Sequence, residues 1–127
     1  MENFKNYLAP FVVVISIVTI FSGLLQIVMP TYVLQLIGAT HSPLAGHLFA
    51  IVGLFMALFG GLMLHTVYSA RTSRVAILWC SFQKLGAFVA VSVGVLKGLF
   101  AFIAIGVALF DLISGILFIV YLKQRRE

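Results

Sequence analysis

The sequence predicts an all-α integral membrane protein, a bundle of four transmembrane helices with both termini in the cytoplasm. Three observations lead to this fold class. The chain of 127 residues is 63% hydrophobic and only 9% charged, too few charges to cover the surface of a water-soluble domain. Four of its apolar stretches reach the length of about 20 residues that a helix needs to cross a bilayer. Positively charged residues collect on one side of these stretches.

The four stretches follow one another closely enough to form a single membrane domain, residues 1–127. The expected spans cover residues 8–29, 47–68, 75–96 and 99–122. The first stretch follows Lys5 and in that respect is similar to a signal peptide. We keep it as a span because its apolar run is longer than a signal-peptide core and has no small-x-small cleavage site.

The connections differ in length. Short turns at residues 69–74 and 97–98 predict that the second span lies beside the third and the third beside the fourth, each pair antiparallel. Residues 30–46 form a longer connection that is half apolar and is bracketed by Pro30 and Pro43. A short helix at the outer interface is expected there.

Lysine and arginine placement predicts the orientation. One side of the spans has six such residues, whereas the other side has only Lys97. Because positive charge is retained in the cytoplasm, both termini and the turn at residues 69–74 are expected there. The six residues are Lys5, Arg71, Arg74, Lys123, Arg125 and Arg126.

Lys84 and Asp111 each place a formal charge inside an apolar stretch. Lys84 lies nine residues from Val75, or about 13 Å, and Asp111 lies ten residues from Tyr121, or about 15 Å, at roughly 1.5 Å per residue. The two therefore share one level near the bilayer midplane. A single charge there costs about 3 kcal/mol or more. The sequence predicts that they form an intramembrane ion pair.

Three interpretations of these charges remain open. The pair can be structural and fix the register of the helices. It can be a site for a proton, an ion or a lipid head group. Alternatively, Asp111 is protonated and donates to a carbonyl, while the Lys84 side chain extends towards the interface. Gln83 and Ser114 are near enough in sequence to complete the hydrogen bonding.

Small residues accompany both charges, and small residues allow helices to approach closely in lipid. The residues expected to pack helices together are Gly86, Ala90, Gly94, Ala104, Ala108 and Gly115. The second span has its own smooth strip at Gly53, Gly60 and Gly61.

Polar side chains of the first span are expected to find hydrogen-bond partners inside the bundle. Gln26 is expected to make a helix–helix hydrogen bond. Ser16, Thr19 and Ser22 can bond to carbonyls of their own helix and are given no role.

His47 and His65 are the candidate cofactor ligands. They lie 18 residues apart on the second span, about 27 Å, so one helix cannot bring both to a single metal or haem. Each would hold a haem or pigment only with help from other chains. Cys80 is the single cysteine and is expected to pack as a small apolar residue. Without paired cysteines or an HExxH pattern, no metal site or cofactor is expected.

No residue can be singled out as catalytic. A Ser–His–Asp set, a GxSxG motif, a P-loop and a dinucleotide fingerprint are all absent from the sequence. A non-enzymatic protein is favoured, although enzyme activity is left open. The net charge of +5 sits mainly at the chain ends and in one loop, which gives no support for nucleic-acid binding.

Two stretches carry a resemblance to a known group of proteins. They are LFAIVGLFMALFGG at residues 48–61 and ALFDLISGILFIVYL at residues 108–122. With the chain length, the four spans and the longer first outer connection, they resemble the small four-helix bacterial membrane proteins called DoxX-like. The resemblance implies a subunit of a quinone-linked or redox complex, or a helper protein. A thiol-redox role would need a pair of cysteines, and this chain has only one.

The expected function is that of a non-catalytic subunit or helper of a larger membrane assembly. Its expected partners are the lipid bilayer and other membrane chains or copies of itself. A second hypothesis is a small oligomeric proton-coupled transporter or channel that uses Lys84 and Asp111. A third is a membrane subunit that binds quinone, haem or pigment through His47 or His65.

Overall fold

The computed structural model describes residues 2–124, with side chains from residue 8 onward, and all regular structure in that range is helical. Four of the helices, α1, α3, α4 and α5, are long and apolar enough to span a membrane. Arg125 and Arg126, which contributed to the predicted orientation, lie outside the described residues. The helices are α1 (Glu2–Val28), α2 (Pro30–Leu36), α3 (Pro43–Tyr68), α4 (Arg74–Leu96) and α5 (Ala104–Gln124).

Local sequence explains where α3 and α4 begin. Pro43 occupies the first turn of α3, where the missing N–H has no helical partner to lose. The Ser42 hydroxyl accepts a hydrogen bond from the Ala45 N–H at 3.1 Å, and Ser73 caps α4 through Ala76 N–H at 3.1 Å. Ser42 and Pro43 therefore start α3 about one turn before residue 47, where the sequence analysis expected it.

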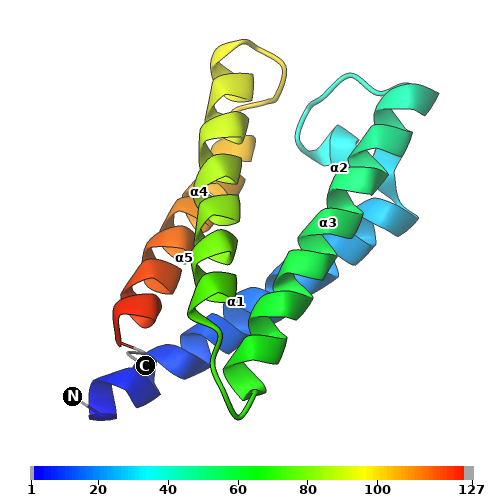
Figure 1. Ribbon diagram of the computed structural model, residues 1–127. Coiled ribbons are helices and arrows are strands. Elements are labelled where there is room, and N and C mark those ends of the chain that lie inside the picture. The colour runs from blue at the N-terminus through cyan, green and yellow to red at the C-terminus, as the bar shows by residue number, and fades with distance from the viewer. Residues whose placement is uncertain (1, 125–127) are drawn as a thin grey trace.

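The four long helices form two pairs (Figure 1). α1 lies along α3, and α4 lies along α5, whereas contacts between the pairs are fewer. The sequence predicted that α3 and α4 lie side by side because the turn between them is short. The two helices instead meet near that turn and diverge along their length (Figure 1). The short α2 and its loop fold α3 back onto α1, which makes that pair possible.

Glycines bring α1 and α3 into close contact. A Cβ added at Gly60 would lie 2.9 Å from the Ser16 carbonyl oxygen, and one at Gly53 would lie 2.6 Å from the Gly23 carbonyl oxygen. At these positions the helices touch through backbone atoms, the geometry that small residues permit in membranes. Gly61, one residue further on, has open space around it.

α4 and α5 also pack through small residues. A Cβ added at Gly115 would lie 2.6 Å from Leu85 Cδ2. Ala104 and Ala108 are both buried, at 1% exposure. These three positions on α5 pack as the sequence predicted.

Gly86 and Ala90 differ from the expectation, because both are exposed in the structure. Lys84 faces the other helix pair. At 3.6 residues per turn, Gly86 and Ala90 are rotated by roughly 200° and 240° from it, which directs them away from the bundle. Gly94, the third member of the expected row, is buried.

The connection before α5 is a loop of residues 97–103, so α5 begins at Ala104 rather than at residue 99. Gly98 turns the chain with a φ of 76°, in the left-handed region that favours glycine. The Phe100 ring then folds back onto Gly94, where an added Cβ would lie 2.5 Å from Phe100 Cε2. This packing holds Phe100 in the loop and delays the start of the helix.

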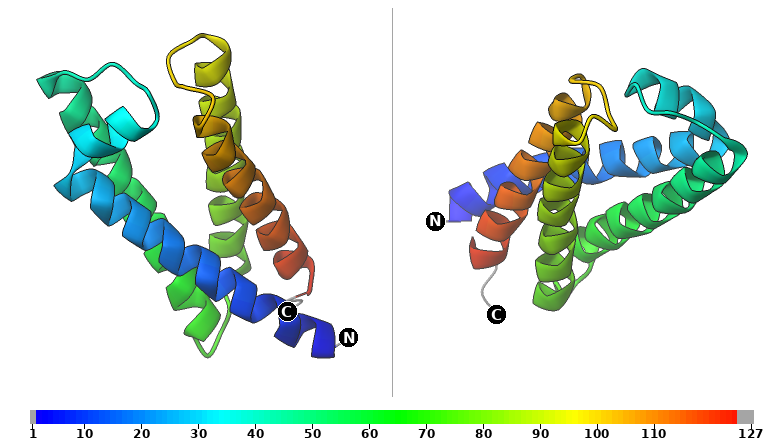
Figure 2. Two further views of the ribbon diagram at one scale, coloured as in Figure 1. Left: turned by 180° about the vertical axis from the view of Figure 1, so that it is seen from behind. Right: turned by 90° about the horizontal axis from the view of Figure 1, so that it is seen from above.

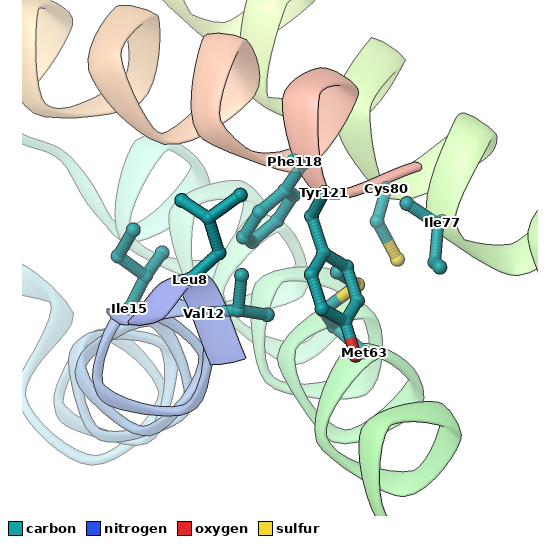
Figure 3. Packing of buried hydrophobic residues seen from close by; sticks show 8 residues of the cluster. All are labelled: Leu8, Val12, Ile15, Met63, Ile77, Cys80, Phe118 and Tyr121. Atoms are coloured by element: carbon teal, nitrogen blue, oxygen red, sulfur yellow. The ribbon is translucent and has the colours of Figure 1, made fainter. Parts of the chain in front are cut away.

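All four long helices meet at the end of the bundle where α1 begins and α5 ends (Figure 2). Their side chains form one buried apolar cluster, which we call the terminal core (Figure 3). Phe118 and Tyr121 extend from α5 towards residues of the other helices (Figure 3). The terminal core consists of Leu8, Val12, Ile15, Met63, Ile77, Cys80, Phe118 and Tyr121. Away from it, towards α2 and the 97–103 loop, the two pairs separate.

Candidate functional site

A cleft of about 480 Å³ lies between the diverging helix pairs. All four long helices and α2 contribute to its walls, which are largely apolar, with Met56 on α3 and Val91 on α4 as examples. The polar side chains of its lining are Thr19, Ser22, Gln26, Gln83, Lys84 and Asp111. The cleft therefore combines a largely apolar lining with a few polar side chains.

Lys84 and Asp111 lie together among these polar side chains, in a region that we call the polar floor. Lys84 Nζ is 3.5 Å from Asp111 Oδ1. The Lys84 side chain is only 4% exposed, and that of Asp111 is 12% exposed. Nζ also lies 5.0 Å from the centroid of the Phe110 ring, within the range of a cation–π interaction. The structure thus brings together the two charges that the sequence placed at one level.

Thr19 is the third member of the polar floor, and sequence reasoning gave it no role. Lys84 Nζ donates a hydrogen bond to Thr19 Oγ1 at 2.5 Å. The Thr19 hydroxyl in turn donates to the Ile15 carbonyl at 2.8 Å, as the sequence suggested. Thr19 lies eleven residues from Leu8, where the candidate span of α1 begins, which is about 16 Å at roughly 1.5 Å per residue. Thr19 and Lys84 therefore lie at similar depths in their spans, and this is the sequence signal that could have linked them.

The two expected supporting residues behave differently. Gln83 is half-buried and lines the cleft. Ser114 is buried, but its hydroxyl oxygen has no hydrogen-bond partner within the part of the chain that the structure describes. Ser114 therefore does not complete the hydrogen bonding of Asp111. On α1, Gln26 Nε2 donates to the Phe49 carbonyl of α3 at 3.2 Å, the helix–helix bond that the sequence predicted.

The two ends of the cleft are bounded by different kinds of contact. The terminal core fills the space between the helices at one end. At the opposite end, the Ala101 N–H of the 97–103 loop donates to the Ile37 carbonyl at 2.7 Å. Gly38 has a φ of 70°, and a Cβ added there would lie 2.5 Å from Ala101 Cβ. A close backbone contact therefore bridges the mouth of the cleft.

The candidate cofactor ligands lie outside the cleft. His47 and His65 are both exposed, near opposite ends of α3. His47 and His41 border a separate shallow hollow of about 580 Å³ between α2 and the start of α3. Among the side chains that the structure describes, from residue 8 to residue 124, no three of His, Cys, Asp or Glu gather where they could hold a metal ion.

Cys80 is buried beside the cleft's closed end. Its thiol donates to the Phe59 carbonyl of α3 at 3.7 Å, and the residue belongs to the terminal core. It packs as the small apolar residue that the sequence predicted.

The polar floor can orient a bound molecule by hydrogen bonding. An ammonium group has three donors, and a carboxylate accepts through two oxygens. Comparisons of the chain with family models, with curated proteins and with solved structures gave no match. The resemblance to DoxX-like proteins therefore stays a prediction.

Proposed function

We propose that this protein is a non-catalytic membrane protein that binds a small lipophilic molecule in its cleft. One observation carries the proposal: a cleft of about 480 Å³ has largely apolar walls and a few polar side chains, the paired Lys84 and Asp111 among them. Sites for small molecules usually measure about 300–1,000 Å³, with an apolar lining and a few polar groups that fix the ligand's orientation. The cleft has both properties.

The proposal includes an orientation in a bacterial inner membrane, with the terminal core towards the cytoplasm. Arg71 and Arg74 lie in or next to the turn between α3 and α4, and Lys123 lies in the last turn of α5, at the same end. Lys97 lies at the opposite end, after α4. This asymmetry supports termini in the cytoplasm. The mouth of the cleft then faces the outer leaflet.

We propose further that the protein works as a subunit or helper of a larger membrane assembly. α4 supports this role, because its outward face combines the exposed small residues Gly86 and Ala90 with bulky aromatic side chains. Trp79 and Phe82 lie edge to face with ring centroids 5.2 Å apart, and both are exposed. Small residues beside aromatic ones suit contact with another membrane helix.

A proton-coupled transporter is the second candidate, favoured by the position of the ion pair. Lys84 and Asp111 line a cleft that the terminal core closes at one end. A transporter would move protons or ions across proteoliposomes, and Asp111→Asn would abolish that flux. A passive binding protein would give no flux in either form.

The test of the proposed function compares two tryptophan substitutions on α4. Ala87 lines the cleft, whereas Ala90 is exposed about one turn away. The protein is extracted in native nanodiscs, and its bound small molecules are identified by mass spectrometry. We expect one lipophilic molecule to be retained by the unmodified protein and by Ala90→Trp, and to be lost from Ala87→Trp. Retention by Ala87→Trp, or bound lipids that match the bulk membrane, would contradict the proposal.

A further inference from the structure

The charges of the polar floor balance each other. Among the described residues, Lys84 and Asp111 are the only charged ones that line the cleft, and they lie 3.5 Å apart. The cleft therefore presents no net formal charge to a ligand. A charged ligand would have to enter hydrocarbon without a free counter-ion, and unpaired charges there are costly.

The two members of the pair are not equally available to a ligand. Lys84 is the more enclosed, since Thr19 accepts its hydrogen bond and the Phe110 ring lies against it. The Asp111 side chain is three times as exposed, 12% against 4%. The Thr19 hydroxyl uses its proton on the Ile15 carbonyl and has none left for a ligand. Of the two charged groups, the more accessible is therefore a hydrogen-bond acceptor, the Asp111 carboxylate.

Each class of head group would meet this floor differently. An anionic head would lie beside the Asp111 carboxylate and be repelled. A cationic head would compete for Asp111 and leave Lys84 without its counter-ion inside the membrane. An uncharged hydroxyl would donate a hydrogen bond to the carboxylate and leave the pair intact, and a hydrogen bond to a charged group is among the stronger ones.

We propose that the cleft binds a neutral, single-chain lipid with a hydroxyl head group. This inference rests on the proposed function and specifies its ligand. The hydroxyl donates to Asp111, and the hydrocarbon chain follows the apolar walls past Met56 and Val91 towards the mouth at Ile37. A volume of about 480 Å³ suits one such chain.

Three probes with the same C18 chain test the head group: oleyl alcohol, oleyl sulfate and oleylamine. Competition binding to purified protein in nanodiscs gives their relative affinities. The unmodified protein is expected to prefer the alcohol by roughly tenfold or more over both ions, the factor that one hydrogen bond to a charged group supplies. Asp111→Asn is expected to shift the preference towards the sulfate, and Lys84→Met towards the amine.

The double variant Lys84→Met/Asp111→Asn tests the proposal if either single variant fails to fold. It lacks both charges, so its affinity for the alcohol is expected to fall by roughly tenfold. Unchanged affinity would overturn the inference.

The failure of this inference can be told apart from failure of the proposed function. If the order of the three probes is the same in all variants but Ala87→Trp weakens all three, the cleft binds lipid and the head group lies elsewhere. If no probe binds and no lipid is retained on purification, the cleft is not a binding site. A tenfold preference for the alcohol that shifts in the Lys84 and Asp111 variants supports both the proposed function and this inference.

Discussion

The terminal core and the cleft lie between the same two helix pairs, yet one is filled by the protein and the other is not. In the terminal core, Val12, Ile77 and Tyr121 are 0% exposed. In the cleft, Ala87 and Val91 remain half-buried although they belong to the same helix as Ile77. In lipid, apolar helices gain little by excluding solvent from each other. A membrane protein can therefore hold a cleft open without exposing apolar surface to water.

The links between the pairs also differ at the two ends. The terminal core is held by close packing of apolar side chains. At the level of the cleft, the links are polar: Lys84 donates to Thr19, and Ala101 donates to Ile37. Substitutions should therefore affect the two regions in different ways.

Loss of one member of the ion pair is expected to have the largest effect. Lys84→Met or Asp111→Asn leaves a buried charge unpaired, which should cost about 3–5 kcal/mol of stability. The double variant should lose less than the sum of the two, because neither charge is then unpaired. Unfolding in SDS, followed by Trp79 fluorescence, measures the loss, and Lys97→Met in the exposed loop is the control. A double variant that loses the full sum would show that the two residues act independently.

Two adjacent glycines test how closely α1 and α3 pack within their pair. A Cβ at Gly60 would meet backbone atoms of α1, whereas Gly61 has open space around it. Gly60→Ala should therefore destabilise the protein by about 1–3 kcal/mol. Gly61→Ala should stabilise it by up to about 1 kcal/mol, because alanine favours helix. Equal effects in the same SDS titration would mean that α1 and α3 are packed loosely.

Two phenylalanines of α5 compare the regions directly. Phe118 is 2% exposed in the terminal core, and Phe118→Ala should cost about 2 kcal/mol. That is less than in a water-soluble protein, since only the cavity contributes when the reference is lipid. Phe110→Ala, on the cleft, should cost about 1 kcal/mol, mainly the contact with Lys84. If Phe110→Ala proved the more costly, the cleft would be the main stabilising interface.

Two glycines near the mouth of the cleft should differ from each other by only about 1 kcal/mol. Gly38 and Gly98 both have positive φ, at 70° and 76°, so either substitution by alanine should cost about 1 kcal/mol in backbone strain. Only Gly38→Ala also pushes against Ala101, which should add about 1 kcal/mol through the weakened loop hydrogen bond.

Spin-label distances across the mouth test that difference. Labels at exposed Leu44 and Leu99, in a Cys80→Ser background, should move apart in Gly38→Ala and stay in place in Gly98→Ala. Movement in both variants would assign the effect to backbone strain alone.

Properties carried by single helices could be predicted from the sequence. Length and hydropathy were enough to find four helices capable of spanning a membrane. Counting residues from the helix ends placed Lys84 and Asp111 at one depth, and the structure finds them 3.5 Å apart. The same counting would have added Thr19, had the first span been included.

The pairing of the helices, the rotation of α4 and the start of α5 could not be predicted. Short turns suggested that α3 and α4 lie together, but a turn fixes only the ends of two helices and not the angle between them. The start of α5 depends on Phe100 packing against Gly94, a contact made after the chain has turned at Gly98. Gly86 and Ala90 have the small side chains of packing residues, and only the rotation of α4 shows that they face outward.

The pairing of α1 with α3, and of α4 with α5, has a consequence for biogenesis. Both pairs join segments that are close in sequence, so the first pair can assemble before α4 has left the ribosome. Lys84 then enters the bilayer 27 residues ahead of Asp111 (111 − 84), a delay of seconds at roughly 5–20 residues per second. During that interval the Thr19 hydroxyl is already in place to receive the ammonium group. Thr19 can thus accept a hydrogen bond from Lys84 before Asp111 has entered the bilayer.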